Sequence, residues 1–124
     1  MIHGVRPVDE HLHTRQSHGY TVVELHGDID IEAAMKIRPH LDAATRPPEI
    51  QIVIDLASVT FFDCSGIGLL CRARRRLTER GGGMLLVCPH PLTLRMLDIL
   101  GLTVRFNPAP TLADALRTRA SVRK

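Results

Sequence analysis

Apolar and polar residues follow one another along this chain with a period that switches repeatedly between that of a strand and that of a helix. Leu12–Arg15 and Tyr20–Leu25 predict two strands joined by four residues that include a glycine, which suits a hairpin. Ile50–Leu56 is apolar on nearly both faces, which is typical of a strand inside a sheet covered by helices. Shorter apolar runs predict further strands at Met84–Val87 and Thr103–Phe106.

Between these strands, apolar residues recur at spacings of three and four, which predicts amphipathic helices. The first has Ala34, Ile37 and Leu41 on one face, and Pro39 within it predicts either a kink or a break. Further helices are predicted at Ser65–Arg80, Pro91–Leu100 and Thr111–Arg117. The order of elements predicts an α/β fold, with a mixed sheet of about five strands and about four helices packed on it.

The length of 124 residues fits a single domain with a core of its own. Residues 1–11 show no apolar period and are interpreted as a flexible N-terminal lead-in, residues 12–118 as the folded domain, and residues 119–124 as a basic C-terminal tail. No apolar run approaches the roughly 20 residues of a membrane span, and the first residues lack the apolar stretch of a signal peptide. Three cysteines without close pairs agree with reduced thiols. We therefore expect a cytoplasmic protein with no membrane contact.

The net charge of +3 rests almost wholly on arginine, since only two of the sixteen basic residues are lysine. Arg72–Arg76 is the densest basic stretch, and it is predicted to be solvated and to steer an acidic partner toward the protein. One tyrosine, three phenylalanines and no tryptophan leave few side chains that stack on bases. Direct nucleic-acid binding is therefore not expected.

The most informative stretch is Phe61–Leu69, where an acid, a thiol and a hydroxyl stand between a buried strand and a helix. A corner of this kind exposes small polar side chains beside unpaired helix amides, and it suits a switch or a nucleophile. Cys64 is here either a reactive thiol, favoured as an anion by the helix N-terminus, or a small buried residue. Ser65 is expected to cap the helix with its hydroxyl. Cys71 and Cys88 are interpreted as core residues.

The same stretch resembles the pattern Phe-(apolar)-Asp-Ser-Ser/Thr-Gly-(apolar)-Gly of anti-sigma factor antagonists, the bacterial branch of the STAS domain family. Upstream, Gly27–Asp30 reads Gly-Asp-Ile-Asp, which is similar to the Gly-Glu-Leu-Asp of that family. The resemblance covers the chain from about Leu12 to Leu116, and it implies the STAS fold for a single domain.

This resemblance implies a non-enzymatic protein that binds an anti-sigma factor, usually a histidine-kinase-like ATPase, and so releases a sigma factor. The contact surface of the family is carried over onto Gly27, Asp28, Asp30, Asp63, Cys64, Ser65 and Gly66. In the family, the serine directly after the aspartate takes the phosphate, whose charge would disrupt a close interface. That position is Cys64 here, so phosphorylation of Ser65, oxidation of Cys64 and absence of regulation all stay open.

A second hypothesis is a regulatory STAS module that senses a small molecule, or serves a transporter or a stressosome-like assembly. A cysteine-based redox enzyme is disfavoured, because the chain has no Cys-x-x-Cys. No cofactor and no metal are expected, since no carboxylate or cysteine completes a site with His11 and His13 at suitable spacing. Asp30 is interpreted as a helix cap and Asp55 as a turn residue, rather than as catalytic acids.

Overall fold

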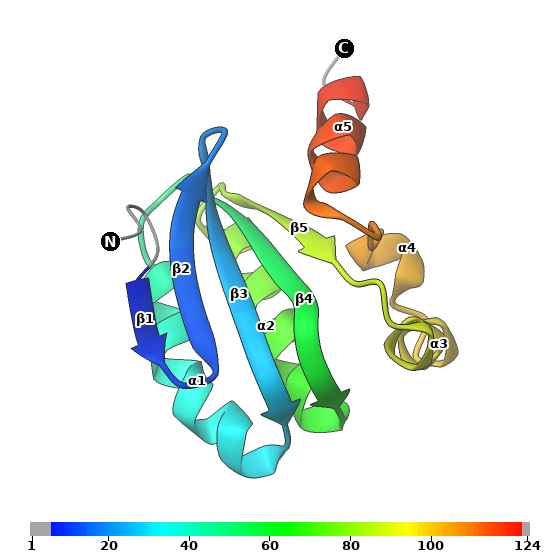
Figure 1. Cartoon of the computed structure of the whole chain (residues 1–124). Coiled ribbons are helices and arrows are strands. Elements are labelled where there is room, and N and C mark those ends of the chain that lie inside the picture. Colours follow the sequence, from blue (N-terminus) through cyan, green and yellow to red (C-terminus); the bar gives the residue numbers. More distant parts are fainter. Residues whose placement is uncertain (1–5, 123–124) are drawn as a thin grey trace.

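The computed structural model describes the backbone of residues 6–122 and the side chains of residues 10–118. Its described part contains a five-stranded sheet in the order β1-β2-β3-β4-β5 (Figure 1). The first three strands are antiparallel neighbours, whereas β3, β4 and β5 run parallel, so the sheet is mixed as predicted. The strands are β1 (Arg6–Asp9), β2 (Leu12–Ser17), β3 (Tyr20–Ile29), β4 (Gln51–Phe62) and β5 (Gly83–Val87).

Two long helices cover one face of the sheet and lie side by side behind it in Figure 1. They are α1 (Ile31–Ala44), between β3 and β4, and α2 (Cys64–Glu79), between β4 and β5. The main core lies between them and the sheet, where Ile37, Ile54 and Leu70 are fully buried. Such crossovers are what a parallel pair of strands requires, since its connection must cross over the sheet.

Three shorter helices follow β5, and they are α3 (Pro91–Ile99), α4 (Thr103–Phe106) and α5 (Leu112–Val122). A smaller apolar cluster lies on the face of the sheet opposite α1 and α2, where Val22 and Val53 pack with Ala115 of α5. The remainder of that face, along β2 and β3, carries polar side chains. One face of the sheet is therefore a core, whereas the other is only partly covered.

The segment Thr103–Phe106 was predicted to be a strand, and this prediction is wrong. It forms the single-turn helix α4, in which the amide of Phe106 donates to the carbonyl of Leu102 at 3.0 Å. Phe106 thereby enters the main core. A run of four mostly apolar residues is too short for its period to separate a strand from a helix.

The lead-in and the tail are both more regular than predicted. Arg6–Asp9 is not an irregular lead-in but an edge strand, in which Pro7 pairs with His13. Proline is tolerated there because an edge strand has one side without ladder partners. α5 reaches Val122 and so includes most of the predicted tail. Residues 1–5 and 123–124 lie outside the described residues.

Two further segments are more continuous than their composition suggested. α1 continues through Pro39 without a break, and this proline is exposed. β4 runs on past Leu56 as far as Phe62. Asp55 lies inside this strand rather than in a turn, and its carboxylate accepts from the amide of Ala57 at 2.9 Å. β4 therefore delivers the polar corner directly to the start of α2.

Candidate functional site

The two sequence motifs meet at one edge of the sheet, where the parallel strands β3 and β4 end together. Ile29 and Phe62 are register partners, so the residues that follow them, Asp30 and Asp63, start two neighbouring helices. Sequence reasoning placed both motifs at strand ends, but only the register shows that they are adjacent. The carboxyl edge of a parallel sheet is also where α/β folds place their sites.

Both helices at this edge are capped by aspartate. The carboxylate of Asp30 accepts from the amide of Ala33 at 2.9 Å, which confirms its predicted role as a cap. The carboxylate of Asp63 accepts from the amide of Ser65 at 2.8 Å. Asp63, with an extended backbone, is therefore the N-cap of α2, and the prediction that Ser65 caps it with its hydroxyl is wrong.

Gly27 and Asp28 lie just before this edge, at the end of β3. Gly27 has φ +76°, a left-handed conformation that favours glycine, so the residue type here follows from the backbone. Asp28 is exposed, and its carboxylate accepts from the Thr60 hydroxyl of β4 at 2.6 Å. The two motifs are thus tied to each other by a side-chain hydrogen bond.

Gly66 differs from the other six predicted contact residues because it is buried. A Cβ at this position would lie 2.5 Å from the ring of Phe62, which is itself buried below the start of α2. Glycine is therefore required here by packing. Gly66 positions the corner rather than offering a side chain to a partner.

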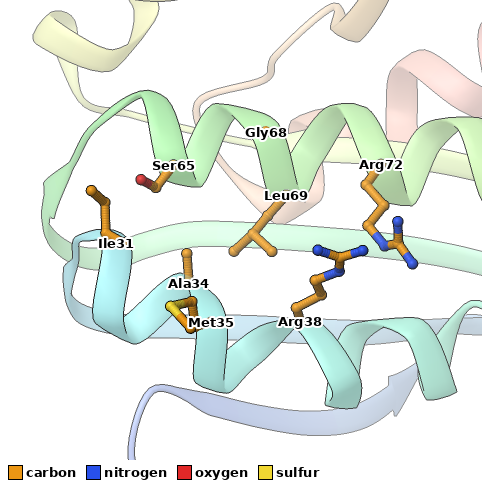
Figure 2. A pocket seen from close by; sticks show the side chains of 8 residues that line it. All are labelled: Ile31, Ala34, Met35, Arg38, Ser65, Gly68, Leu69 and Arg72. Carbon is orange, nitrogen blue, oxygen red and sulfur yellow. The ribbon is translucent and has the colours of Figure 1, made fainter.

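A groove runs between α1 and α2 from this edge (Figure 2). It is lined by Ile31, Ala34, Met35 and Arg38 from α1 and by Ser65, Gly68, Leu69 and Arg72 from α2. Ile31 and Met35 are 66% and 71% exposed, although both are large and apolar. Phe61, at the end of β4, is 50% exposed at the same edge. The sequence did not reveal that these three side chains are exposed, because the residue type of an apolar side chain does not show whether it is buried or at the surface.

A family model described as the STAS domain matches residues 11–115 of the chain. This chain belongs to the STAS domain family. It is 29% identical over 85 residues to an anti-sigma F factor antagonist of Paenibacillus polymyxa, a match that covers 68% of this chain and 73% of the relative.

Two solved structures extend this similarity to the fold of the STAS domain. An anti-sigma factor antagonist from Mycobacterium paratuberculosis is 30% identical, with a TM-score of 0.77 over 96% of this chain and 98% of that protein. The anti-sigma factor antagonist SpoIIAA in its unphosphorylated form is 25% identical, with a TM-score of 0.72 over 88% and 96% of the two chains. The STAS fold implied by the sequence motifs is therefore confirmed.

The arginines of α2 do not form the solvated cluster that the sequence predicted for this STAS domain. Arg72 makes two hydrogen bonds to the carboxylate of Asp42 on α1, at 2.8 and 2.9 Å. Arg76 reaches the same helix end, where it donates to the Thr45 hydroxyl at 2.9 Å. Of this stretch, Arg75 is exposed as predicted. Sequence reasoning missed the role of Asp42, because α1 and α2 are joined only in space.

The hydrogen bonds from Arg72 hold the pKa of Asp42 below its ordinary value of 3.8 against the opposing effect of partial burial, and the charges of Arg72, Arg76 and Arg38 add to the lowering. The same pair raises the pKa of Arg72. A lowered carboxyl pKa means that this pairing stabilises the fold fully above the unfolded value near 3.8, and that the stabilisation is lost as the pH falls through the native pKa.

We therefore expect Asp42→Asn to lower the melting temperature by about 5 °C at pH 7, because two half-buried arginines lose their charged partner. The difference from the unmodified protein should shrink below about pH 4, where Asp42 itself becomes neutral. Thermal unfolding monitored by circular dichroism at several pH values measures both effects. Glu32→Gln on the exposed side of α1 is the control, and it should change little. An equal loss in both variants would contradict the assignment.

The three thiols have distinct environments in the STAS domain. Cys64 is exposed at the first residue of α2, so the interpretation as a small buried residue is wrong. Cys71 is half-buried against the main core, and Cys88 is buried, which agrees with their predicted packing roles. Burial raises the pKa of the Cys88 thiol and so favours its neutral form.

The sequence predicted neither a membrane span nor a metal site. Among the residues that the structure describes, no helix combines the length and the apolar character needed to cross a bilayer. The argument against a metal site fails, however, because strand pairing brings Glu24 and His26 beside His13. Spacing along the chain did not show this, since His13 lies on the neighbouring strand.

Proposed function

We propose that this STAS domain is an anti-sigma factor antagonist, which binds an anti-sigma factor and so releases a sigma factor. Its relatives with this name support the general role. The proposed partner is a histidine-kinase-like ATPase, as the resemblance to the antagonist branch implies. The protein acts by association and dissociation alone, with no catalytic step of its own.

The observation that carries this proposal is the meeting of the two motifs beside exposed apolar side chains. Gly27–Asp30 and Asp63–Gly66 adjoin at the carboxyl edge, and the groove between α1 and α2 opens from it. Ile31, Met35 and Phe61 supply apolar area at the surface. Protein interfaces commonly combine such an apolar centre with a polar rim.

The charges at this surface suggest how a partner is oriented on it. Asp28 is exposed near the carboxyl edge, whereas Arg38 and Arg72 stand farther along the groove in Figure 2. A partner that presents a basic group toward Asp28 and an acidic group toward the arginines would match both. Such complementarity sets the register of a complex and speeds its formation.

Met35→Ser tests the surface directly. We expect it to raise the dissociation constant for the anti-sigma partner at least about tenfold, because truncation of an apolar anchor at the centre of an interface commonly has an effect of this size. Its exposure of 71% means that the fold should keep its melting temperature. Binding is measured by isothermal titration calorimetry with the ATPase that co-purifies with the native protein.

Val104→Ser is the matched control, since Val104 is apolar, 94% exposed and located on α4. It should leave the affinity unchanged. Equal losses in both variants would mean that the contact surface lies elsewhere. Recovery of transporter subunits, without any ATPase, would favour the alternative of a regulatory module and would end the present proposal.

A further inference from the structure

The part of the second sheet face that α5 leaves uncovered carries a cluster of side chains able to bind a metal, and this cluster is separate from the proposed partner surface. His13 on β2 is the register partner of Glu24 on β3, and His26 follows two residues later on the same face. One ligand atom from each of the three lies within 4.8 Å of those of the other two. All three residues are half-buried.

Two atoms of this cluster already have the separation that a bound ion requires. The Nε2 atom of His26 lies 3.5 Å from the Oε1 atom of Glu24. Tetrahedral zinc with bonds of about 2.1 Å separates its ligand atoms by about 3.4 Å. The ring of His13 stands beside that of His26, with centroids 4.3 Å apart, and its ligand nitrogen lies within 4.8 Å of the other two ligand atoms.

The Nε2 atom of His26 is buried and makes no hydrogen bond within the described part of the chain, and its contact with the Oε1 atom of Glu24 at 3.5 Å is an ion pair only when the imidazole is protonated. A buried polar atom without a partner is costly unless something else satisfies it. A metal ion between His26, His13 and Glu24 would do so.

The surroundings orient the carboxylate for this role. The guanidinium of Arg15 donates to the Oε2 atom of Glu24 at 2.8 Å, which leaves Oε1 directed toward His26. Hydrogen bonds of this kind fix a ligating carboxylate in place. Asp55, the register partner of Glu24 on β4, adds a further negative charge on the same face.

We propose that His13, Glu24 and His26 bind one Zn²⁺ ion on the uncovered face of the sheet. Two imidazoles and one carboxylate are a ligand set that zinc accepts, with a water molecule at the fourth position. The ion ties β2 to β3 close to Gly27 near the end of β3, and it satisfies the buried nitrogen of His26.

Zinc titration of the untagged chain at pH 7.5 tests this proposal, with Cys64→Ser in every protein so that the exposed thiol does not compete. Isothermal titration calorimetry should show one zinc ion per chain. The melting temperature should rise by about 5 °C or more when free zinc exceeds the dissociation constant a hundredfold. Cobalt in place of zinc should give the intense visible absorption of a tetrahedral ion.

His26→Gln and His13→Gln should each weaken zinc binding at least about tenfold, since even partners outside the ligand set alter affinity by this much. His18→Asn is the matched control, because His18 is an exposed histidine at the turn of the same hairpin with φ +53°, which asparagine tolerates. The proposal is overturned if zinc does not bind one-to-one in the micromolar range. It is equally overturned if His26→Gln binds zinc as the parent does, or if only His18→Asn weakens binding.

Discussion

Replacement of Cys64 by serine is expected to turn a protein that the proposed kinase partner leaves without phosphate into one that accepts a single phosphate. Position 64 is exposed at the first residue of α2. A serine hydroxyl there would be accessible to the γ-phosphate of bound ATP, and the helix N-terminus would favour the negative charge of the phosphate added to it. Ser65 is instead half-buried and faces the groove between α1 and α2 (Figure 2). We therefore expect no efficient phosphorylation of the parent chain, which has cysteine at position 64.

Intact-protein mass spectrometry after incubation with the proposed ATPase partner and ATP measures this gain. The double variant Cys64→Ser, Ser65→Ala should still be modified, whereas Cys64→Ala should not. The added phosphate, with about two negative charges, should weaken partner binding, because it would stand beside the carboxylate of Asp63. Stoichiometric phosphate on Ser65 of the parent protein would contradict the prediction. So would a Cys64→Ser variant that binds the kinase and receives no phosphate.

Two glycine-to-alanine changes in the same helix are expected to act with opposite signs. Gly66→Ala places a methyl group within 2.5 Å of the buried Phe62 ring, and overpacking of this kind typically costs about 1–3 kcal/mol. Gly68→Ala meets no atom within 4 Å in the described part of the chain, and alanine in a helix is favoured over glycine by about 0.5–1 kcal/mol. The net expectation is a loss of about 1–2 kcal/mol for the first and a gain of under about 1 kcal/mol for the second.

Urea unfolding curves of the two variants and the parent measure these free energies. Phe62→Leu in the Gly66→Ala background should recover part of the loss, since it removes the ring atoms that the new methyl group meets. Gly66→Ala should also weaken partner binding, because a shift at the start of α2 moves Cys64 and Ser65. A stable Gly66→Ala protein with unchanged affinity would show that the corner does not depend on this contact.

Much of the fold was predictable because it follows from local periodicity. The hairpin of β2 and β3, the buried strand β4 and the stripe of α2 all appear in the order of apolar residues. The α4 segment was not predictable in this way, since its four residues complete barely one turn. The edge strand β1 was missed because only pairing with β2 distinguishes it from an irregular segment.

In the candidate site, too, some features follow from the local sequence, whereas others depend on the pairing of distant segments. Residue types alone marked Asp63, Cys64 and Ser65 as a polar corner, and the resemblance to the family added Gly27 and the expected role of both motifs. The contact between the two motifs, through Asp28 and Thr60, depends on a register that no local pattern contains. The capping role went to Asp63 rather than Ser65 because α2 begins at Cys64, whereas a cap at Ser65 would have its first helical residue at Gly66.

The sequence by itself determined the order and type of most elements, because the alternation of apolar and polar side chains is a property of neighbouring residues. Only the tertiary structure decided which distant side chains meet. Arg72 pairs with Asp42 because α1 and α2 pack in parallel crossovers on one face, and His13 meets Glu24 because β2 and β3 pair in one register. These contacts arise from the packing of whole elements against one another, and a one-residue change of the β2 register would move His13 to the opposite face of the sheet from Glu24.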